Sequence, residues 1–159
     1  MAKIVKQCQD LPGQELFEYQ LESGEPAKVG SNDVNEYLRE ITQEDFSAKD
    51  FRTWHGTGHM AAALAKLGPA ETERHAKLNI VDAVKETAKY LANRPAACRK
   101  YYIHPAVFES YTEKTIFSMI RNVPDDEAPS HTLRPFELSV MKLVEAYTGS
   151  RGNSVKSQA

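Results

Sequence analysis

The chain has 159 residues, of which 41% are hydrophobic and 26% charged, and its formal net charge at pH 7 is −2. A chain of this length and composition can bury a hydrophobic core without needing disulfide bonds or bound metal ions for stability. We therefore expect neither a disordered nor a fibrous protein. No apolar stretch approaches the ~18 residues that a membrane-spanning helix needs. Cys8 and Cys98 stand in no metal-binding spacing, which favours a reduced protein of the cytoplasm.

The first thirty residues carry only a weak pattern. Residues 15–22 alternate weakly between polar and apolar side chains, and Ser23-Gly24-Glu25-Pro26 is typical of a turn. We therefore expect a short hairpin in this part of the chain.

Helical periodicity dominates after residue 31. Ser31 and Asp33 are candidate caps for a first helix, and Ser47 for a second helix that ends at Gly68-Pro69. A third helix is expected to occupy much of 70–92. Its predicted apolar line consists of Leu78, Val81, Val84, Ala88 and Leu91.

Two prolines predict the starts of further helices. Pro95 suits the first turn of a short helix, and Pro105 opens another that should continue to Ile120. An exposed acidic loop over 122–134 should precede a last helix near 135–148. The sequence thus predicts a mainly α protein, an orthogonal bundle of about five to seven helices, in one domain over 1–148. The polar residues 149–159 are expected to form a disordered tail.

Two segments carry candidate catalytic chemistry. The first, residues 48–54, contains Arg52, whose guanidinium fork suits a phosphate. The second, residues 94–105, places Tyr102 just after the cations Arg99 and Lys100. Breaking a phosphodiester without a metal needs a nucleophile, cations for the phosphoryl oxygens and an acid for the departing alkoxide. Nearby positive charge can activate a phenol for such an attack.

These segments resemble the C-terminal catalytic segment of type IB DNA topoisomerases, of the short form shared by bacteria and poxviruses. Lys49-Asp50-Phe51-Arg52-Thr53 resembles the family motif Lys-Asp-(Phe or Leu)-Arg-Thr. Tyr102-Ile103-His104-Pro105 resembles the nucleophile and the residues that follow it. The stretches 8–17 and 34–40 also look similar to the family, so the resemblance runs from about residue 3 to about residue 112.

The resemblance implies a role for each matching residue. Tyr102 would be the nucleophile, and Arg52 would clamp the phosphate. Asn93, nine positions before Tyr102, would donate a hydrogen bond to a phosphoryl oxygen, and Lys49 would help to protonate the leaving oxygen. The implied activity is ATP-independent relaxation of supercoiled double-stranded DNA through a 3′-phosphotyrosine, with no metal or other cofactor. We expect a monomer, associated with the nucleoid.

Basic residues near Tyr102 are candidate DNA contacts. Arg94, Arg99 and Lys100, together with Lys85 and Lys89, form either a DNA-facing strip or an ordinary solvated surface. DNA contacts of this kind depend on the charge of the contacting face rather than on the net charge.

The sequence departs from the family pattern at three places. Relatives carry a further arginine and a hairpin lysine upstream, and nothing here matches them. We therefore expect a C-terminal fragment that relaxes DNA poorly or not at all by itself. His55 stands where a small residue is expected, and Arg94 replaces the usual threonine before Pro95.

Other interpretations stay open. A tyrosine recombinase or integrase would use the same chemistry, although it carries His-x-x-Arg where this chain has Lys49-x-x-Arg52. A helical module that only binds DNA or protein is a second alternative. Tyr101 competes with Tyr102 as nucleophile. His55 and His59 have the spacing of a zinc pair, but the glutamate of a zinc protease is missing.

Overall fold

The structure, a computed structural model, describes residues 17–120 and 132–156. It consists of two compact units, Met1–Asp50 and Phe51–Ala159. The single domain over 1–148 stays a prediction. The expectation of a mainly α protein is confirmed, since seven helices and one small sheet make up the described residues. Within the same residues, no helix has both the length and the apolar character that crossing a membrane requires.

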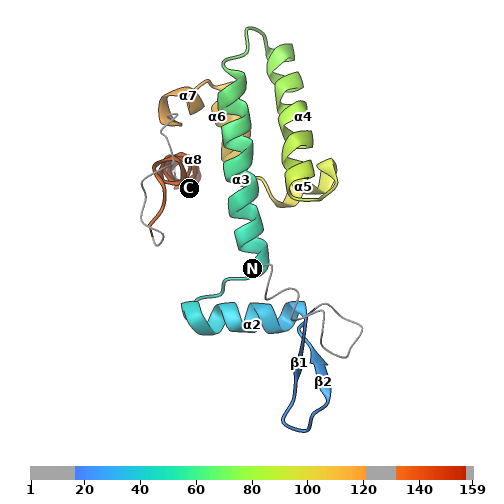
Figure 1. Ribbon diagram of the computed structural model, residues 1–159. Coiled ribbons are helices and arrows are strands. Elements are labelled where there is room, and N and C mark those ends of the chain that lie inside the picture. The colour runs from blue at the N-terminus through green and yellow to red at the C-terminus, as the bar shows by residue number, and fades with distance from the viewer. Residues whose placement is uncertain (1–16, 121–131, 157–159) are drawn as a thin grey trace. The chain divides into compact units, whose positions relative to one another are not determined.

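The first unit contains the predicted hairpin and a helix (Figure 1). Strands β1 (Glu18–Gln20) and β2 (Pro26–Lys28) pair antiparallel, with Tyr19 opposite Ala27. Gly24 has a φ of 84°, a turn conformation that glycine adopts without a steric cost. Helix α2 (Ser31–Thr42) is capped by Gly30 rather than by Ser31, and the Asp33 carboxylate accepts a 2.6 Å hydrogen bond from the Gly30 N–H.

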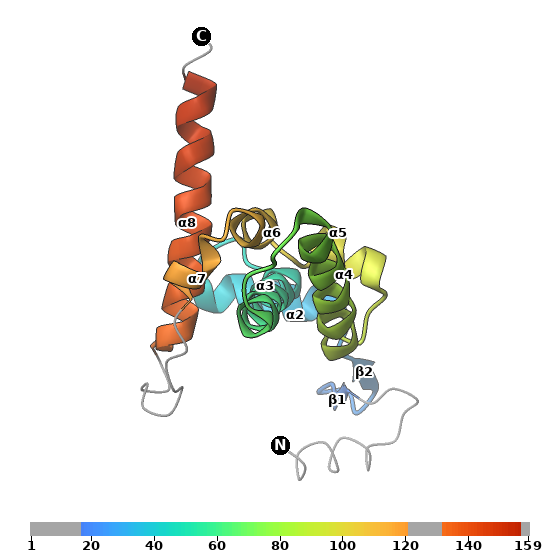
Figure 2. The same ribbon diagram turned by 90° about the horizontal axis from the view of Figure 1, so that it is seen from above.

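Two long helices lie side by side in the second unit (Figures 1 and 2). They are α3 (Ala48–Leu67), whose first residues belong to the first unit, and α4 (Glu73–Tyr90). Gly68, with a φ of 76°, ends α3 as predicted. Thr72 caps α4, and its hydroxyl accepts a hydrogen bond from the His75 N–H.

Shorter helices complete the core of the second unit. Helices α5 (Pro95–Tyr101) and α6 (Pro105–Thr112) begin at the two predicted prolines. They are followed by α7 (Ile116–Met119) and α8 (Pro135–Lys156), and α6 packs against α4, α7 and α8. The largest fully buried side chains are Tyr111, Met60, Leu64, Ile116, Leu143, Val107, Val140, Thr87 and Cys98.

The predicted buried face of α4 is wrong in part. Leu78 and Val81 are 56% and 45% exposed. The buried residues of α4 include the predicted Val84 and Ala88, and the full set is Ala76, Ile80, Ala83, Val84, Thr87 and Ala88. Small residues let neighbouring helices approach closely, so packing favoured the alanine-rich face over the face with larger apolar side chains.

The last helices also differ from the prediction. The helix expected from Pro105 to Ile120 is interrupted, since Lys114 adopts a φ of 65° between α6 and α7. Helix α8 continues to Lys156, into the region that composition assigned to a disordered tail. Most of the predicted acidic loop lies outside the described residues.

Candidate active site

The carboxyl end of α4 forms one side of the candidate site. The Asn93 N–H donates to the Ala88 carbonyl at 2.8 Å, and the Ala92 N–H donates to the Lys89 carbonyl at 3.1 Å. Ala92 has a φ of 51°. These bonds and this left-handed residue define a Schellman motif, which reverses the chain after Leu91. The motif leaves the Leu91 carbonyl at the negative end of the helix dipole.

Arg52 binds this helix end. Its Nη2 donates a 2.8 Å hydrogen bond to the Leu91 carbonyl oxygen, across 39 positions of sequence. A cation at a helix carboxyl end compensates the partial negative charge of the terminal carbonyls. The guanidinium is therefore held by a backbone atom, while the side chain as a whole stays exposed.

The same guanidinium contacts the candidate nucleophile. The Cζ atom of Arg52 lies 5.1 Å from the centroid of the Tyr102 ring, within the range of a cation–π interaction. Tyr102 ends α5, where its N–H donates to the Cys98 carbonyl at 3.0 Å, and its ring is half-buried against the core. The structure thus brings together the predicted phosphate clamp and the predicted nucleophile.

Asn93 lies two residues beyond the carbonyl that Arg52 binds. Its side-chain Oδ1 accepts a 2.8 Å hydrogen bond from the Arg94 N–H at the start of α5. Because Oδ1 already accepts this bond, the NH₂ group of the side chain is the end suited to donate to a phosphoryl oxygen. Asn93 therefore joins the end of α4 to the start of α5, the helix that carries Tyr102.

Tyr101, the competing nucleophile, has a different environment. It is 50% exposed, and the Nζ atom of Lys100 lies 5.0 Å from its ring centroid. The contact of Arg52 is with Tyr102. Lys100 therefore places its charge over the ring of Tyr101, whereas Arg52 places its charge over the ring of Tyr102.

Cys98 shows that the charge of Arg52 also acts toward the interior. Burial raises the pKa of the Cys98 thiol, and the nearby Arg52 guanidinium partly opposes this shift. Cys98 is fully buried and stays a neutral thiol at physiological pH. Its contribution to this region is packing in the core against which Tyr102 lies.

Lys49 lies in the first turn of α3, within the first unit. Ser47, the predicted cap of this helix, donates from its backbone N–H and its hydroxyl to the Asp50 carboxylate, at 2.9 and 2.7 Å. These bonds lower the pKa of Asp50 and keep it charged beside Lys49. The role of Lys49 in proton transfer remains a prediction.

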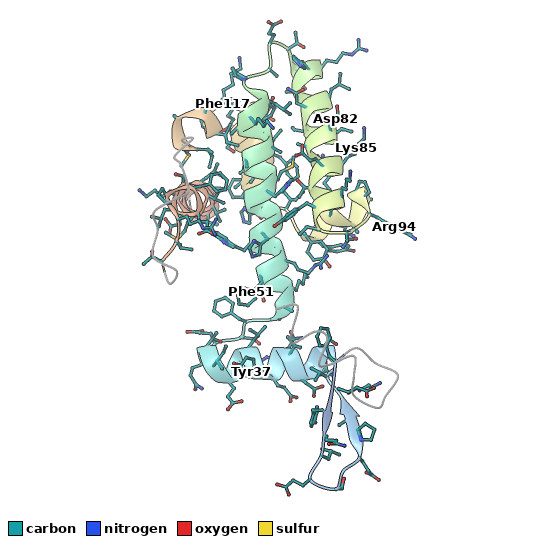
Figure 3. All side chains as sticks on the ribbon, in the orientation of Figure 1. Tyr37, Phe51, Asp82, Lys85, Arg94 and Phe117 are labelled. Atoms are coloured by element: carbon teal, nitrogen blue, oxygen red, sulfur yellow. The ribbon has the colours of Figure 1, made fainter. Side chains whose placement is uncertain are left out.

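The three predicted DNA contacts have unequal surroundings. Arg94 is the N-cap residue of α5 and makes no capping bond with its side chain, which extends away from the helices (Figure 3). Arg99 lies over the Phe108 ring, with its Cζ atom 4.6 Å from the ring centroid. Lys100 lies over Tyr101, as described above. Arg94 is thus the one of the three that has the clearest path to a phosphate.

The predicted histidine pair separates into two roles. His59 stacks on Tyr90 with 4.4 Å between ring centroids, and its Nδ1 lies 3.1 Å from the Thr87 hydroxyl. His55 is exposed and, with Trp54 and His59, lines a pocket of about 310 Å³. No group of three side chains able to hold a metal ion gathers among the described residues. His59 therefore contributes to helix packing.

Sequence reasoning missed one part of the region and anticipated another, a structural His104 that bonds backbone near the nucleophile. The Leu91 carbonyl could not be identified, because a backbone atom carries no residue identity. His104 caps α6, since its Nδ1 accepts a 3.3 Å bond from the Ala106 N–H. Its position directly before Pro105 was a usable signal, because proline favours the first turn of a helix. Burial lowers the pKa of His104, which keeps Nδ1 available as an acceptor.

Comparison with known proteins assigns the family. A family model described as the catalytic core of eukaryotic DNA topoisomerase I matches residues 1–122. The chain is also 30% identical over 130 residues to DNA topoisomerase 1B of Acanthamoeba polyphaga mimivirus. That match covers 77% of this chain and 38% of the viral protein, so the chain spans well under half of that relative. The matched residues include Arg52, Asn93 and Tyr102, and the chain belongs to the family of the DNA topoisomerase I catalytic core.

Proposed function

We propose that this chain supplies the nucleophile and a phosphate clamp of a type IB DNA topoisomerase, which relaxes supercoiled double-stranded DNA without ATP. The observation that carries the proposal is the position of the Arg52 guanidinium, hydrogen-bonded to the Leu91 carbonyl and 5.1 Å from the Tyr102 ring centroid. A planar cation fixed beside a phenol suits a phosphodiester, since its fork matches two phosphoryl oxygens.

In the proposed reaction, the Tyr102 phenol gives up its proton to water, favoured by the positive charge of Arg52, and its oxygen attacks a backbone phosphorus. A bond forms between this oxygen and phosphorus, and the bond from phosphorus to the 5′ oxygen breaks. The 5′ oxygen leaves with the electron pair and takes a proton, with assistance from Lys49. Arg52 and the Asn93 amide stabilise the charge on the non-bridging oxygens. The phosphotyrosyl diester conserves the bond energy, so the 5′ hydroxyl can reseal the strand by the reverse step.

The proposed partner is the DNA backbone, and no metal or nucleotide takes part in the proposed step. Contacts to phosphates bind DNA with little sequence selectivity and with a steep dependence on salt. Arg94, Arg99 and Lys100 are the proposed contacts beside the nucleophile. A monomer suffices for the proposed step, and the expected location is the nucleoid in the cytoplasm.

A single-turnover assay tests the proposal on the 159-residue chain. A nicked duplex is prepared with sulfur replacing the 5′ bridging oxygen at the cleaved bond. A thiolate leaves without needing a proton, so cleavage requires the nucleophile and the clamp but no general acid. We expect a covalent adduct, and peptide mapping should place the DNA on Tyr102.

Matched variants identify the nucleophile. Tyr102→Phe should abolish the adduct and leave the dissociation constant for DNA nearly unchanged. Tyr101→Phe, the same change one position earlier, should still form the adduct. Absence of any adduct with the wild-type chain would refute the proposed function and favour a module that only binds DNA. Strand exchange between two duplexes, instead of relaxation of one, would indicate a recombinase.

A further inference from the structure

One face of α3 contacts the backbone of the segment that carries Tyr102. The Thr57 hydroxyl, on a side chain only 2% exposed, accepts a 3.1 Å hydrogen bond from the His104 N–H. One turn earlier on the helix, the Thr53 hydroxyl lies 3.4 Å from the Tyr101 carbonyl oxygen, to which it donates. These two threonines therefore hold the backbone on both sides of Tyr102.

Gly56 lies between these contacts and permits a close approach. A Cβ atom at this position would lie 2.3 Å from the Tyr102 carbonyl oxygen and 3.3 Å from the Tyr102 carbonyl carbon. Both atoms belong to the backbone, so they cannot rotate away as a flexible side chain can. Any larger residue at position 56 must displace the Tyr102 backbone or the helix.

Arg52 and Gly56 are four residues apart in α3, so they lie on the same side of the helix. The helix that positions the guanidinium over the Tyr102 ring thus also supports the Tyr102 backbone. A single rigid element therefore sets the distance between the clamp and the phenol.

We infer that Gly56 and Thr57 are positioning residues, which hold the backbone of Tyr102 at the distance from Arg52 that attack on the phosphate requires. They act through Tyr102 and touch no substrate. The inference rests on the proposed function, because it assigns Tyr102 as the nucleophile. It predicts that small changes in these two residues alter the rate of the covalent step rather than DNA binding.

The first test compares the same substitution at two glycines of α3. Gly56→Ala should lower the rate of adduct formation at saturating DNA about a hundredfold, since displacements near 1 Å have effects of this size. The dissociation constant for DNA should stay within about twofold, because phosphate contacts elsewhere dominate affinity. Gly58→Ala is the control, since a Cβ there meets only the Phe136 ring at 3.8 Å. Equal rates for the two variants would overturn the inference.

The second test examines Thr57 with a measurement that needs no DNA. Thr57→Val keeps the shape of the buried side chain but removes the oxygen that accepts from the His104 N–H. We expect faster hydrogen exchange at the His104 amide and about a tenfold slower adduct formation. Thr57→Ser keeps the hydroxyl and should restore both values. This pair also decides the question if Gly56→Ala does not fold.

The possible outcomes separate the inference from the proposed function. If the wild-type chain forms no adduct, the proposed function fails, and the role of positioning a nucleophile falls with it. A different result would refute the inference alone. In that case the wild-type chain forms the adduct, and Thr57→Val exchanges its His104 amide faster but forms the adduct at the wild-type rate. Unchanged exchange in Thr57→Val also overturns the inference, because the supporting hydrogen bond would then be absent.

Discussion

Arg52 makes two contacts that depend on the shape of its guanidinium. One N–H group reaches the Leu91 carbonyl, while the Cζ atom lies over the Tyr102 ring. An ammonium group has the same charge but lacks the rigid fork and the flat face. The position of the charge beside Tyr102 therefore depends on arginine itself.

The prediction at this scale is that Arg52→Lys retains the charge but loses its position. The rate of adduct formation should fall about a hundredfold, the usual effect of losing one donor that stabilises an oxyanion. The free energy of unfolding should fall by about 1 kcal/mol as the helix end loses its cation. Denaturant titration and the single-turnover assay measure the two effects. Arg74→Lys, on the exposed surface of α4, is the control. A rate equal to that of wild type would show that charge alone suffices.

At the scale of the elements, the segment after Tyr102 depends on a neutral histidine. His104 Nδ1 accepts from the Ala106 N–H, and the ring packs edge-on against Tyr147 with 5.5 Å between centroids. A protonated imidazole has no acceptor at Nδ1, so it cannot cap α6 in this way. Burial favours the same neutral form, since it lowers the pKa of His104 below the ordinary value of 6.5.

This lowered pKa predicts how stability depends on pH. Below about pH 6.5 the unfolded chain takes up a proton at His104 more readily than the folded chain does, so protonation favours unfolding. The contribution of His104 to stability is therefore complete above that pH and is lost as the pH falls toward the folded-state pKa. Urea titrations between about pH 5 and pH 8 should show this decline. His104→Asn retains a capping oxygen without a titrating group and should flatten the curve. Identical curves for the two proteins would contradict the prediction.

Local signals predicted where most helices begin or end. Pro95 and Pro105 start α5 and α6 because proline fixes its φ near the helical value, and Gly68 ends α3 because glycine adopts a positive φ without steric cost. The buried face of α4 was harder to predict. Leu78 and Val81 fit a helical period, yet packing placed the alanine-rich face inside.

At the scale of the whole molecule, a net charge of −2 offers no general attraction for DNA. Some charges on the described surface are also paired, such as Lys85 with Asp82 at 2.8 Å (Figure 3). The proposed DNA binding would therefore depend on local cations near Tyr102. Arg94 is the clearest of these, since its side chain extends from the start of α5.

The prediction at this scale concerns salt. The slope of log Kd against log salt concentration should become shallower by about 1 in Arg94→Gln, because one phosphate contact is lost. Affinity should fall similarly for unrelated DNA sequences. Lys77→Gln removes a cation that pairs with Glu73 at the other end of α4 and should leave the slope unchanged. Equal slopes for Arg94→Gln and wild type would place the DNA elsewhere. Fluorescence anisotropy at several salt concentrations measures these values.

The mainly α fold, most helix ends and the family could be predicted from the residues alone, because caps, prolines, glycines and the motif around Arg52 act over a few neighbouring residues. The contacts that hold the candidate site together could not be predicted in this way. The bond from Arg52 to Leu91 spans 39 positions, and the support of Tyr102 by Gly56 joins segments 46 positions apart. Such contacts follow from how helices pack against each other. The packing of two helices depends on the shapes of all the side chains between them, so the spacing of residues along the chain does not predict it.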